Sequence, residues 1–272
     1  MFDGFTLIAG PCVLEDDDLN LEIGRRLAWL SSKLGIHTVY KASFDKANRS
    51  NVDSPRGPGL AVGLEQLRRV KDETDLPILT DVHEVGQVAA VARVADILQI
   101  PAFLCRQTDL LSAAGSTGKL VNIKKGQWMT PEDMLGAVQK ARKAGAEGVA
   151  VTERGTFFGY GDLIVDMRAF QRIRDACGVP VIFDGTHSVQ RPGLDSGSSG
   201  GDPAFVPALV RAAVAAGCDG LFLEVHPNPG RAPSDGSTML PLDQLEPLLE
   251  QVAAIRTALA EVDRVVPTTS VG

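Results

Sequence analysis

Eight polar residues with chemically useful side chains recur along the chain, each at or just beyond the end of a short apolar run. They are Cys12, Lys41, Asp81, Gln99, Lys124, Arg154, His187 and Glu224. A helix-like stretch follows each run. One such residue would mean little, but eight at equivalent positions indicate that strand ends gather these side chains at one face of a barrel. We expect this face to hold a metal ion at one end and a polyanion at the other.

A thiol, an imidazole and two carboxylates form the candidate metal ligands. Cys12 follows the first apolar run, His187 the seventh, and Glu224 and Asp235 the eighth. These donors suit a borderline divalent ion such as Zn²⁺, Fe²⁺ or Mn²⁺. Simpler interpretations exist, since a lone cysteine after a strand is commonly a small buried side chain and a histidine can hydrogen-bond to a loop. Glu224 is the strongest member, because an acid that ends the run Leu-Phe-Leu needs a partner or a metal.

A second set consists of cations expected at the same face. It comprises Lys41, Lys46, Lys124 and Arg154. Alternation along a strand would point Lys41 the same way as Ser43, and Lys124 the same way as Asn122. A lysine at a strand end is commonly only a solvated edge charge. Several cations in one hollow of a protein with net charge −7 instead predict a small, highly anionic ligand, such as a phosphorylated metabolite.

Two further features of this face concern the loop after the second strand and the acid after the third. Arg49 and Ser50 could hold a second phosphate, the arginine as a fork and the serine through its hydroxyl. Asp81, in Leu-Thr-Asp-Val-His-Glu, is expected to act as a counter-charge or proton acceptor among the cations. Its carboxylate could instead cap the helix expected to begin near Val85.

The elements that position these residues alternate regularly. Strands are predicted at 5–10, 37–43, 77–82, 97–101, 120–124, 148–153, 180–184 and 220–225, and helices at 19–34, 59–73, 85–95, 107–115, 131–144, 164–177, 204–216 and 242–262. Helix-stopping glycines precede several strands, as at Gly35, Gly145 and Gly217. Eight alternations favour a parallel sheet covered by helices, and their number favours an α/β fold of the (β/α)8 TIM barrel type over an open doubly wound sheet.

Length and composition are consistent with one catalytic domain spanning residues 1–272. The net charge of −7 argues against nucleic acid or an anionic membrane as a partner. No span approaches the roughly 20 apolar residues needed to cross a bilayer, and no secretion signal is recognisable. The 4 cysteines include no short-spaced pair, which indicates neither a disulfide framework nor a zinc ribbon. The expected location is therefore cytoplasmic.

Two loops are unusual for a barrel. Residues 44–58 are polar and long for a connection between a strand and a helix. Residues 193–203 are rich in glycine and serine, a composition typical of linkers. The second loop follows the seventh strand, so it is interpreted either as an exposed loop or as a lid over the site.

Several long motifs resemble one enzyme family. They are Ile8-Ala-Gly-Pro-Cys12, Tyr40-Lys-Ala-Ser-Phe-Asp-Lys-Ala-Asn-Arg-Ser50, Leu79-Thr-Asp-Val-His-Glu84, Leu98-Gln-Ile-Pro-Ala-Phe-Leu-Cys-Arg-Gln107, Val121-Asn-Ile-Lys-Lys-Gly-Gln127, Asp184-Gly-Thr-His-Ser-Val-Gln190 and Ser234-Asp-Gly-Ser-Thr238. From end to end, the chain resembles the 3-deoxy-D-manno-octulosonate 8-phosphate synthases. The resemblance implies condensation of phosphoenolpyruvate with D-arabinose 5-phosphate, release of phosphate, the same barrel and a homotetramer. The family's product feeds the lipopolysaccharide inner core.

The resemblance also implies a role for each site residue. The family has a metal-dependent branch with a cysteine where the other branch has asparagine, and Cys12 would place this chain in the metal-dependent branch. The implied metal ligands are Cys12, His187, Glu224 and Asp235. The residues expected around phosphoenolpyruvate are Lys41, Ser43, Lys46, Gln99, Lys124 and Arg154, and those expected to act in catalysis are Lys41, Lys46, Asp81, Lys124, Arg154 and His187. Arabinose 5-phosphate would meet Asn48, Arg49, Ser50 and Gln190, while Phe103 and Arg106 would reach into a neighbouring subunit's site.

Other functions remain open. A 3-deoxy-7-phosphoheptulonate synthase would share the fold, phosphoenolpyruvate and the metal but take erythrose 4-phosphate. Its loop after the second strand typically reads Lys-Pro-Arg-Thr-Ser, whereas this chain has Lys46-Ala-Asn-Arg-Ser50, which favours the five-carbon sugar. A sialic acid synthase would carry an extra carboxyl-terminal module. A non-catalytic sugar-phosphate binding protein would not need every metal and cation position.

Overall fold

A computed structural model describes residues 4–49, 51–191 and 200–265 of the chain. Within these residues, eight parallel strands form a closed barrel. They are β1 (Thr6–Gly10), β2 (His37–Lys41), β3 (Ile78–Asp81), β4 (Ile97–Ile100), β5 (Leu120–Lys124), β6 (Gly148–Glu153), β9 (Val181–Asp184) and β12 (Gly220–His226). The barrel closes where β1 pairs in parallel with β12, so the first and last of these strands are neighbours. The predicted (β/α)8 barrel is confirmed.

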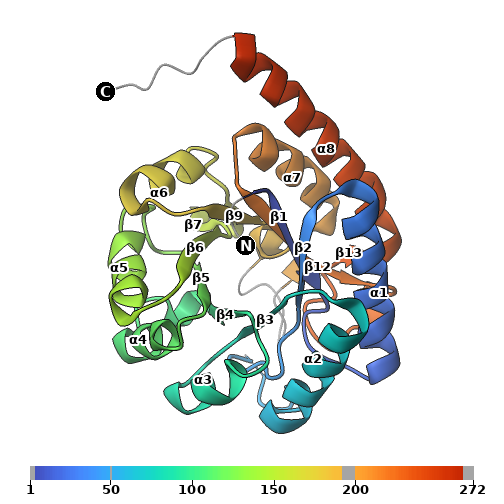
Figure 1. Ribbon diagram of the computed structural model, residues 1–272. Coiled ribbons are helices and arrows are strands. Elements are labelled where there is room, and N and C mark those ends of the chain that lie inside the picture. Colours follow the sequence, from blue (N-terminus) through green and yellow to red (C-terminus); the bar gives the residue numbers. More distant parts are fainter. Residues whose placement is uncertain (1–3, 50, 192–199, 266–272) are drawn as a thin grey trace.

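A helix follows each barrel strand and packs on the outside. These helices are α1 (Asp17–Leu34), α2 (Leu60–Thr74), α3 (Val85–Val91), α4 (Thr108–Ser116), α5 (Met134–Ala144), α6 (Ala169–Cys177), α7 (Val206–Ala215) and α8 (Leu242–Val265). Figure 1 shows them as a ring around the strands. Asp16 caps α1 by accepting a hydrogen bond from the Leu19 amide at 2.9 Å. Gly35 and Gly145 end α1 and α5 with φ values of 62° and 113°, as the predicted helix stops require.

Two apolar layers hold the barrel together. The outer layer lies between strands and helices and continues around the molecule. The inner layer receives one side chain from each barrel strand: Ile8, Val39, Leu79, Ile97, Leu120, Ala150, Ile182 and Phe222. Such a layer fills the interior of the described barrel at this level, so the interior is a packed core.

The polar layer of the site follows directly from the inner core. On several strands, a polar residue follows the inner-core residue two positions later: Lys41 follows Val39, Asp81 follows Leu79, and Glu224 follows Phe222. In the same way, β4 supplies Gln99, and β5 supplies Asn122 and Lys124. Because side chains alternate along a strand, residues two apart share a face. The same alternation that buries the apolar core therefore stacks the functional side chains above it at the carboxyl ends.

Some sequence predictions need correction. The helix predicted at 164–177 begins only at Ala169, because an antiparallel hairpin, β7 (Thr156–Gly159) with β8 (Asp162–Ile164), precedes it. Gly161 allows its turn with a φ of 102°. The helix predicted at 85–95 ends at Val91.

The loop at 193–203 lies partly outside the described residues. Of its neighbourhood, β10 (Gln190–Arg191) pairs in antiparallel fashion with β11 (Gly200–Gly201). The lid interpretation therefore stays a prediction. Among the described residues, no helix has the length and apolar character needed to cross a membrane.

Candidate metal and anion-binding site

A cavity of about 960 Å³ opens at the carboxyl ends of the barrel strands. Among the described residues that line it are five cations, Lys41, Lys46, Arg49, Lys124 and Arg154, and three carboxylates, Asp81, Glu224 and Asp235. The cavity is therefore basic, although the chain has a net charge of −7. Local enrichment of this kind favours an anionic ligand.

Three of the four predicted metal ligands converge beside this cavity. One ligand atom from each of Cys12, Glu224 and Asp235 lies within 4.8 Å of the other two. The Cys12 thiol donates a hydrogen bond to Asp235 Oδ2 at 2.9 Å. His187 stands at the edge of this group, with Nε2 3.6 Å from Glu224 Oε2. The ends of β1, β9 and β12 and the loop after β12 thus bring all four residues together.

Local backbone features place the thiol and one carboxylate. A Cβ atom at Gly10 would lie 2.1 Å from the carbonyl oxygen of Lys41, so only glycine allows β1 to approach β2 this closely just before Cys12. Asp235 has a φ of 51°, a left-handed conformation that is uncommon for a residue with a side chain. Both features constrain the local backbone conformation, and both occur where the candidate ligand side chains converge.

Glu224 is buried with one oxygen paired and one unpaired. Its Oε1 accepts a hydrogen bond from Lys41 Nζ at 2.7 Å, and the two side chains are 0% and 2% exposed. Burial opposes ionisation, but the Lys41 ammonium outweighs it and lowers the pKa of Glu224 to about 2. Its Oε2 has no hydrogen-bond partner among the described residues. A buried carboxylate oxygen without a partner is costly unless a cation binds it, so this donor set fits a divalent metal.

Asp184 orients His187 toward the cluster. Asp184 Oδ2 lies 2.8 Å from His187 Nδ1, which leaves Nε2 facing Glu224. Lys124 Nζ donates to the same Asp184 oxygen at 2.7 Å. Burial opposes the charge on Asp184, but His187 and Lys124 hold the pKa of this carboxyl below its ordinary range. A carboxylate behind a histidine is the arrangement that fixes the ring of a metal-ligating imidazole.

The surroundings of the Cys12 thiol favour its protonated form when no metal ion is bound. Burial raises the pKa of Cys12 well above its ordinary value, and the carboxylates of Asp235 and Glu224 raise it further. A thiolate is the form that binds metal. Binding of a divalent ion here would therefore release the thiol proton.

Phe222 forms an apolar floor under two of the cations. Its ring centroid lies 3.7 Å from Lys124 Nζ and 5.3 Å from Lys41 Nζ. Arg154 Nη2 donates to Gln190 Oε1, while Arg154 Nη1 is buried with no hydrogen-bond partner among the described residues. Burial lowers the pKa of both Lys124 and Arg154, because removal from water disfavours the charged forms. Lys124 is paired with Asp184, whereas Arg154 forms no ion pair among the described residues, so an anionic ligand would supply the counter-charge that Arg154 lacks.

Asp81 organises the opposite wall of the cavity. Its Oδ1 accepts a hydrogen bond from Ser43 Oγ at 2.5 Å, and its Oδ2 lies 2.8 Å from His83 Nε2. Lys46 Nζ donates to Ser43 Oγ at 3.1 Å. Although burial opposes the charge, the hydrogen bond with His83 and the positive charge of Lys46 hold the pKa of Asp81 below its ordinary range. Asp81 is thus a fixed counter-charge; α3 has no side-chain cap, so the helix-cap interpretation is wrong.

The predicted sugar-phosphate residues are only partly brought together. Asn48, Arg49 and Gln190 line the cavity, and Arg49 donates to the carbonyl oxygens of Pro55 and Pro233 at 2.9 and 3.0 Å. Ser50 lies outside the described residues. Phe103 lines the cavity of its own chain, whereas the exposed Arg106 does not line it. Their predicted entry into a neighbouring subunit is not tested by one chain.

In a comparison with known protein families, one family model matches the chain over all the barrel strands. The family model described as "DAHP synthetase I family" covers residues 3–261. The chain belongs to this family.

Within the DAHP synthetase I family, the chain is similar to proteins named 2-dehydro-3-deoxyphosphooctonate aldolase. One from Syntrophotalea carbinolica is 57% identical over 92% of this chain and 90% of its own length. Those from Desulfosudis oleivorans and a Cyanothece species are each 54% identical over 94% of this chain, covering 91% and 93% of their own lengths. These identities place the chain in the 2-dehydro-3-deoxyphosphooctonate aldolase group of the family, as the motifs predicted.

Four residues of this family member belong to the site although the motif analysis assigned them no role. Asp184 and His83 orient other side chains, and Gln127 and Phe157 line the cavity. His83, Gln127 and Asp184 lie within the quoted motifs, and an acid three residues before His187 was a usable signal. Phe157 lies on the unpredicted β7–β8 hairpin, so no sequence pattern placed it.

Proposed function

We propose that the chain is a transferase that condenses phosphoenolpyruvate with D-arabinose 5-phosphate and water. The products are 3-deoxy-D-manno-octulosonate 8-phosphate, for lipopolysaccharide biosynthesis, and inorganic phosphate. One observation carries the proposal: a basic cavity, in a chain of the 2-dehydro-3-deoxyphosphooctonate aldolase group, adjoins a cluster of a thiol, an imidazole and two carboxylates. Such a cavity has room for two phosphorylated substrates and a cation between them.

Phosphoenolpyruvate would bind at the end of the cavity above Phe222. It carries about three negative charges, and four cations surround this end: Lys41, Lys46, Lys124 and Arg154. Ser43 and Gln99 supply neutral hydrogen-bonding groups beside them. Fixed charges of this kind position a substrate and stabilise developing charge, which supplies several kcal/mol each in comparable sites.

Arabinose 5-phosphate would lie toward the loop after β2. Arg49 is the cation of this end, and its guanidinium is already oriented by two backbone carbonyls. Asn48 and Gln190 offer amides to the sugar hydroxyls, and Ser50 is proposed to complete the phosphate site. This arrangement would direct the aldehyde of the sugar toward the middle of the cavity.

The reaction joins two carbons and breaks one carbon–oxygen bond. The methylene carbon of phosphoenolpyruvate attacks the aldehyde carbon, whose oxygen takes up a proton. Water adds to the carbon that bears the phosphate, and the resulting tetrahedral intermediate expels phosphate by carbon–oxygen cleavage. Lys124 and Arg154, both buried beside the cavity, hold the charge of the departing phosphate.

A divalent metal would be held by Cys12, His187, Glu224 and Asp235. The unpartnered Oε2 of Glu224 supports this assignment. Bound there, Zn²⁺, Fe²⁺ or Mn²⁺ would polarise the sugar aldehyde or orient the attacking water. Because a branch of the resembled family has asparagine in place of the cysteine, we favour orientation over generation of a strong nucleophile.

A homotetramer in the cytoplasm is the proposed state of the protein. Large exposed apolar side chains support association: Phe103, Phe158 and Tyr160 are 53%, 86% and 107% exposed. Light scattering after size-exclusion chromatography would test the assembly. A monomer at micromolar concentration would contradict it.

The test of the proposed function is a comparison of phosphate release from phosphoenolpyruvate with two sugars. Arabinose 5-phosphate should support release, and erythrose 4-phosphate should not. Preference for erythrose 4-phosphate would instead identify a 3-deoxy-7-phosphoheptulonate synthase. Repeating both assays after chelation, and again after adding back each metal, tests the metal independently of the sugar.

A further inference from the structure

Lys125 and Glu153 form a buried ion pair on the outer side of the barrel mouth. Lys125 Nζ lies 3.4 Å from Glu153 Oε2, and both side chains are 1% exposed. Because side chains alternate along a strand, Lys124 and Arg154 point into the cavity while their sequence neighbours Lys125 and Glu153 point outward. Two adjacent strand ends thus each carry one residue inside the site and one in the pair behind it.

The pair also joins the two loops that border this side of the site. The Lys125 ammonium donates to the Met129 carbonyl of the loop after β5 at 3.2 Å, and to the Thr156 hydroxyl on β7 at 3.3 Å. Glu153 Oε1 accepts a hydrogen bond from the Gly155 amide at 2.7 Å. A single buried ammonium therefore fixes the loop after β5 against the end of β6.

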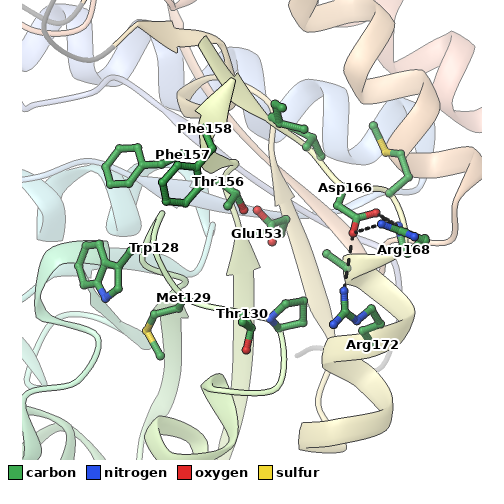
Figure 2. Close-up of a pocket in the computed structure, with 15 residues that line it drawn as sticks. Trp128, Met129, Thr130, Glu153, Thr156, Phe157, Phe158, Asp166, Arg168 and Arg172 are labelled. Carbon is green, nitrogen blue, oxygen red and sulfur yellow. Dashed lines mark hydrogen bonds and ion pairs between the residues drawn. The ribbon is translucent and has the colours of Figure 1, made fainter. Parts of the chain in front are cut away.

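These loops reach the substrate cavity. Gln127 and Phe157 line it, and the Phe157 amide donates to the Gln127 carbonyl at 3.0 Å. Behind them is a second cavity of about 610 Å³, which is lined by Glu153 and, from its other side, by Phe157. Figure 2 shows Glu153 next to Thr156 in this outer cavity, with Trp128 on the facing loop.

Stability alone is a weak explanation for this pair. Its neighbours in the outer layer, such as Ile123 and Val151, are apolar, and a buried ion pair commonly contributes no more than a well-packed apolar pair would. Within the described ranges, Lys125 is the one cation that forms an ion pair with Glu153. What the charges add is a defined geometry, since each has one counter-charge, Lys125 donates hydrogen bonds to both loops, and Glu153 Oε1 accepts one from the Gly155 amide.

We infer that Lys125 and Glu153 are positioning residues that set the separation of Lys124 and Arg154 and thereby the affinity for phosphoenolpyruvate. This inference rests on the proposed function. Neither residue of the pair lines the cavity that would hold phosphoenolpyruvate, so their effect acts through the two cations and the two loops. The affinity for the sugar phosphate, which would bind at the loop after β2, would not depend on the Lys125–Glu153 pair.

Steady-state kinetics and calorimetry on four variants test the inference. Glu153→Gln keeps the side-chain volume and an acceptor for the Gly155 amide but removes the negative charge. Lys125→Met removes the ammonium, and Lys125→Arg restores a cation that can still meet Glu153. Lys71→Met is the matched control, because Lys71 pairs with Asp96 at 2.7 Å away from the cavity.

Glu153→Gln and Lys125→Met should each raise the KM for phosphoenolpyruvate about tenfold, with kcat changed less than about threefold and the KM for arabinose 5-phosphate unchanged. Titration calorimetry should show the same loss of phosphoenolpyruvate affinity. Lys125→Arg should stay within about twofold of wild type in KM, and Lys71→Met should lower Tm without changing KM.

Three outcomes would overturn the inference: an unchanged KM for phosphoenolpyruvate in both variants, an equal rise in the KM of both substrates, or failure of Glu153→Gln to fold. The last would make the pair a stabilising element only. Failure of the proposed function is distinguishable, because the wild-type protein would then release no phosphate with arabinose 5-phosphate before any variant is compared.

Discussion

The Cys12 thiol donates a hydrogen bond to Asp235 Oδ2 at 2.9 Å although 223 positions separate the two residues in the sequence. The contact exists because β1 and β12 are adjacent where the barrel closes. It links the loop after the first strand to the loop after the last barrel strand. The candidate metal site therefore spans the closure of the barrel.

Replacing Cys12 should abolish metal binding and leave a metal-free activity. Cys12→Asn removes the thiolate ligand but keeps a polar group that can orient water or the aldehyde. We expect wild type to lose at least about tenfold in phosphate release on chelation, and the variant to change less than about twofold. Metal content by mass spectrometry should fall to background. Cys105→Ala, at a buried thiol outside the cluster, should keep its metal.

Complete loss of turnover in Cys12→Asn with the fold intact would contradict an orienting role for the metal. Circular dichroism and the midpoint of thermal unfolding establish whether the fold is intact. A variant that retains metal would instead remove Cys12 from the ligand set.

Replacing Glu224 should destabilise the barrel, because its buried ion-pair partner Lys41 would lose its counter-charge. Glu224→Gln leaves the Lys41 ammonium buried without a counter-charge. Breaking a buried pair in this way costs about 3–5 kcal/mol in free energy of unfolding, measured by urea denaturation. The control is Glu246→Gln, which loses surface pairs with Lys33 and Arg26 that contribute about 0–1 kcal/mol each. Equal losses in the two variants would contradict the prediction.

The Asp81–His83 pair should stabilise the protein most in mildly acidic solution. Burial opposes the charge on His83, but its hydrogen bond to Asp81 raises its pKa above the ordinary value. A histidine with a raised pKa contributes stability that is fully present below about pH 6.5 and is lost as the pH rises through its folded pKa. Asp81, whose pKa is lowered, contributes above about pH 4 and loses its contribution only in stronger acid.

The measurement is the difference in Tm between wild type and His83→Gln as a function of pH. The difference should be largest near pH 5.5 and smaller at pH 9, with each kcal/mol corresponding to about 2–4 °C for a chain of this size. His37→Gln, on the exposed end of β2, is the contrasting variant: burial lowers the pKa of His37, so its Tm difference should not be largest in mildly acidic solution. A Tm difference that grows with pH would rule out the charged pair.

Arg49 should determine the affinity for arabinose 5-phosphate and not the affinity for phosphoenolpyruvate. Arg49→Met removes the guanidinium that Pro55 and Pro233 orient. We expect the KM for arabinose 5-phosphate to rise about 10- to 100-fold, and the KM for phosphoenolpyruvate to stay within about twofold. Arg56→Met on the same loop is the control, because Arg56 pairs with Asp45 at the surface and does not line the cavity. A parallel rise in the KM for phosphoenolpyruvate would show that Arg49 does not act on the sugar phosphate alone.

Much of the barrel and the position of the site could be predicted from the sequence. Apolar runs of strand length end in Lys41, Lys124 and Glu224, and alternation predicts that these side chains share a face with the inner core. The predicted strand bounds agree with the structure to within two residues at each end. This agreement follows from the repetitive pattern of a barrel, in which local periodicity and overall fold coincide.

Other features depend on contacts that no local pattern records. The β7–β8 hairpin occupies a stretch that contains Phe157 and two glycines, and its role in lining the cavity follows from the Gln127–Phe157 contact. Phe103 and Arg106 were predicted together, but the short 3-10 helix at Ala102–Leu104 turns the chain so that only Phe103 lines the cavity. The orientation of His187 by Asp184 likewise depends on a loop conformation that sequence spacing only suggests.

Closure of the barrel between β1 and β12 has a consequence for biosynthesis of the protein. The proposed thiol ligand, Cys12, emerges from the ribosome early and the proposed carboxylate ligands, Glu224 and Asp235, emerge late, so a growing chain would have no complete set of ligands. Capture of the proposed metal ion would therefore follow synthesis of nearly the entire polypeptide, and products truncated before Glu224 would lack the full set of ligands.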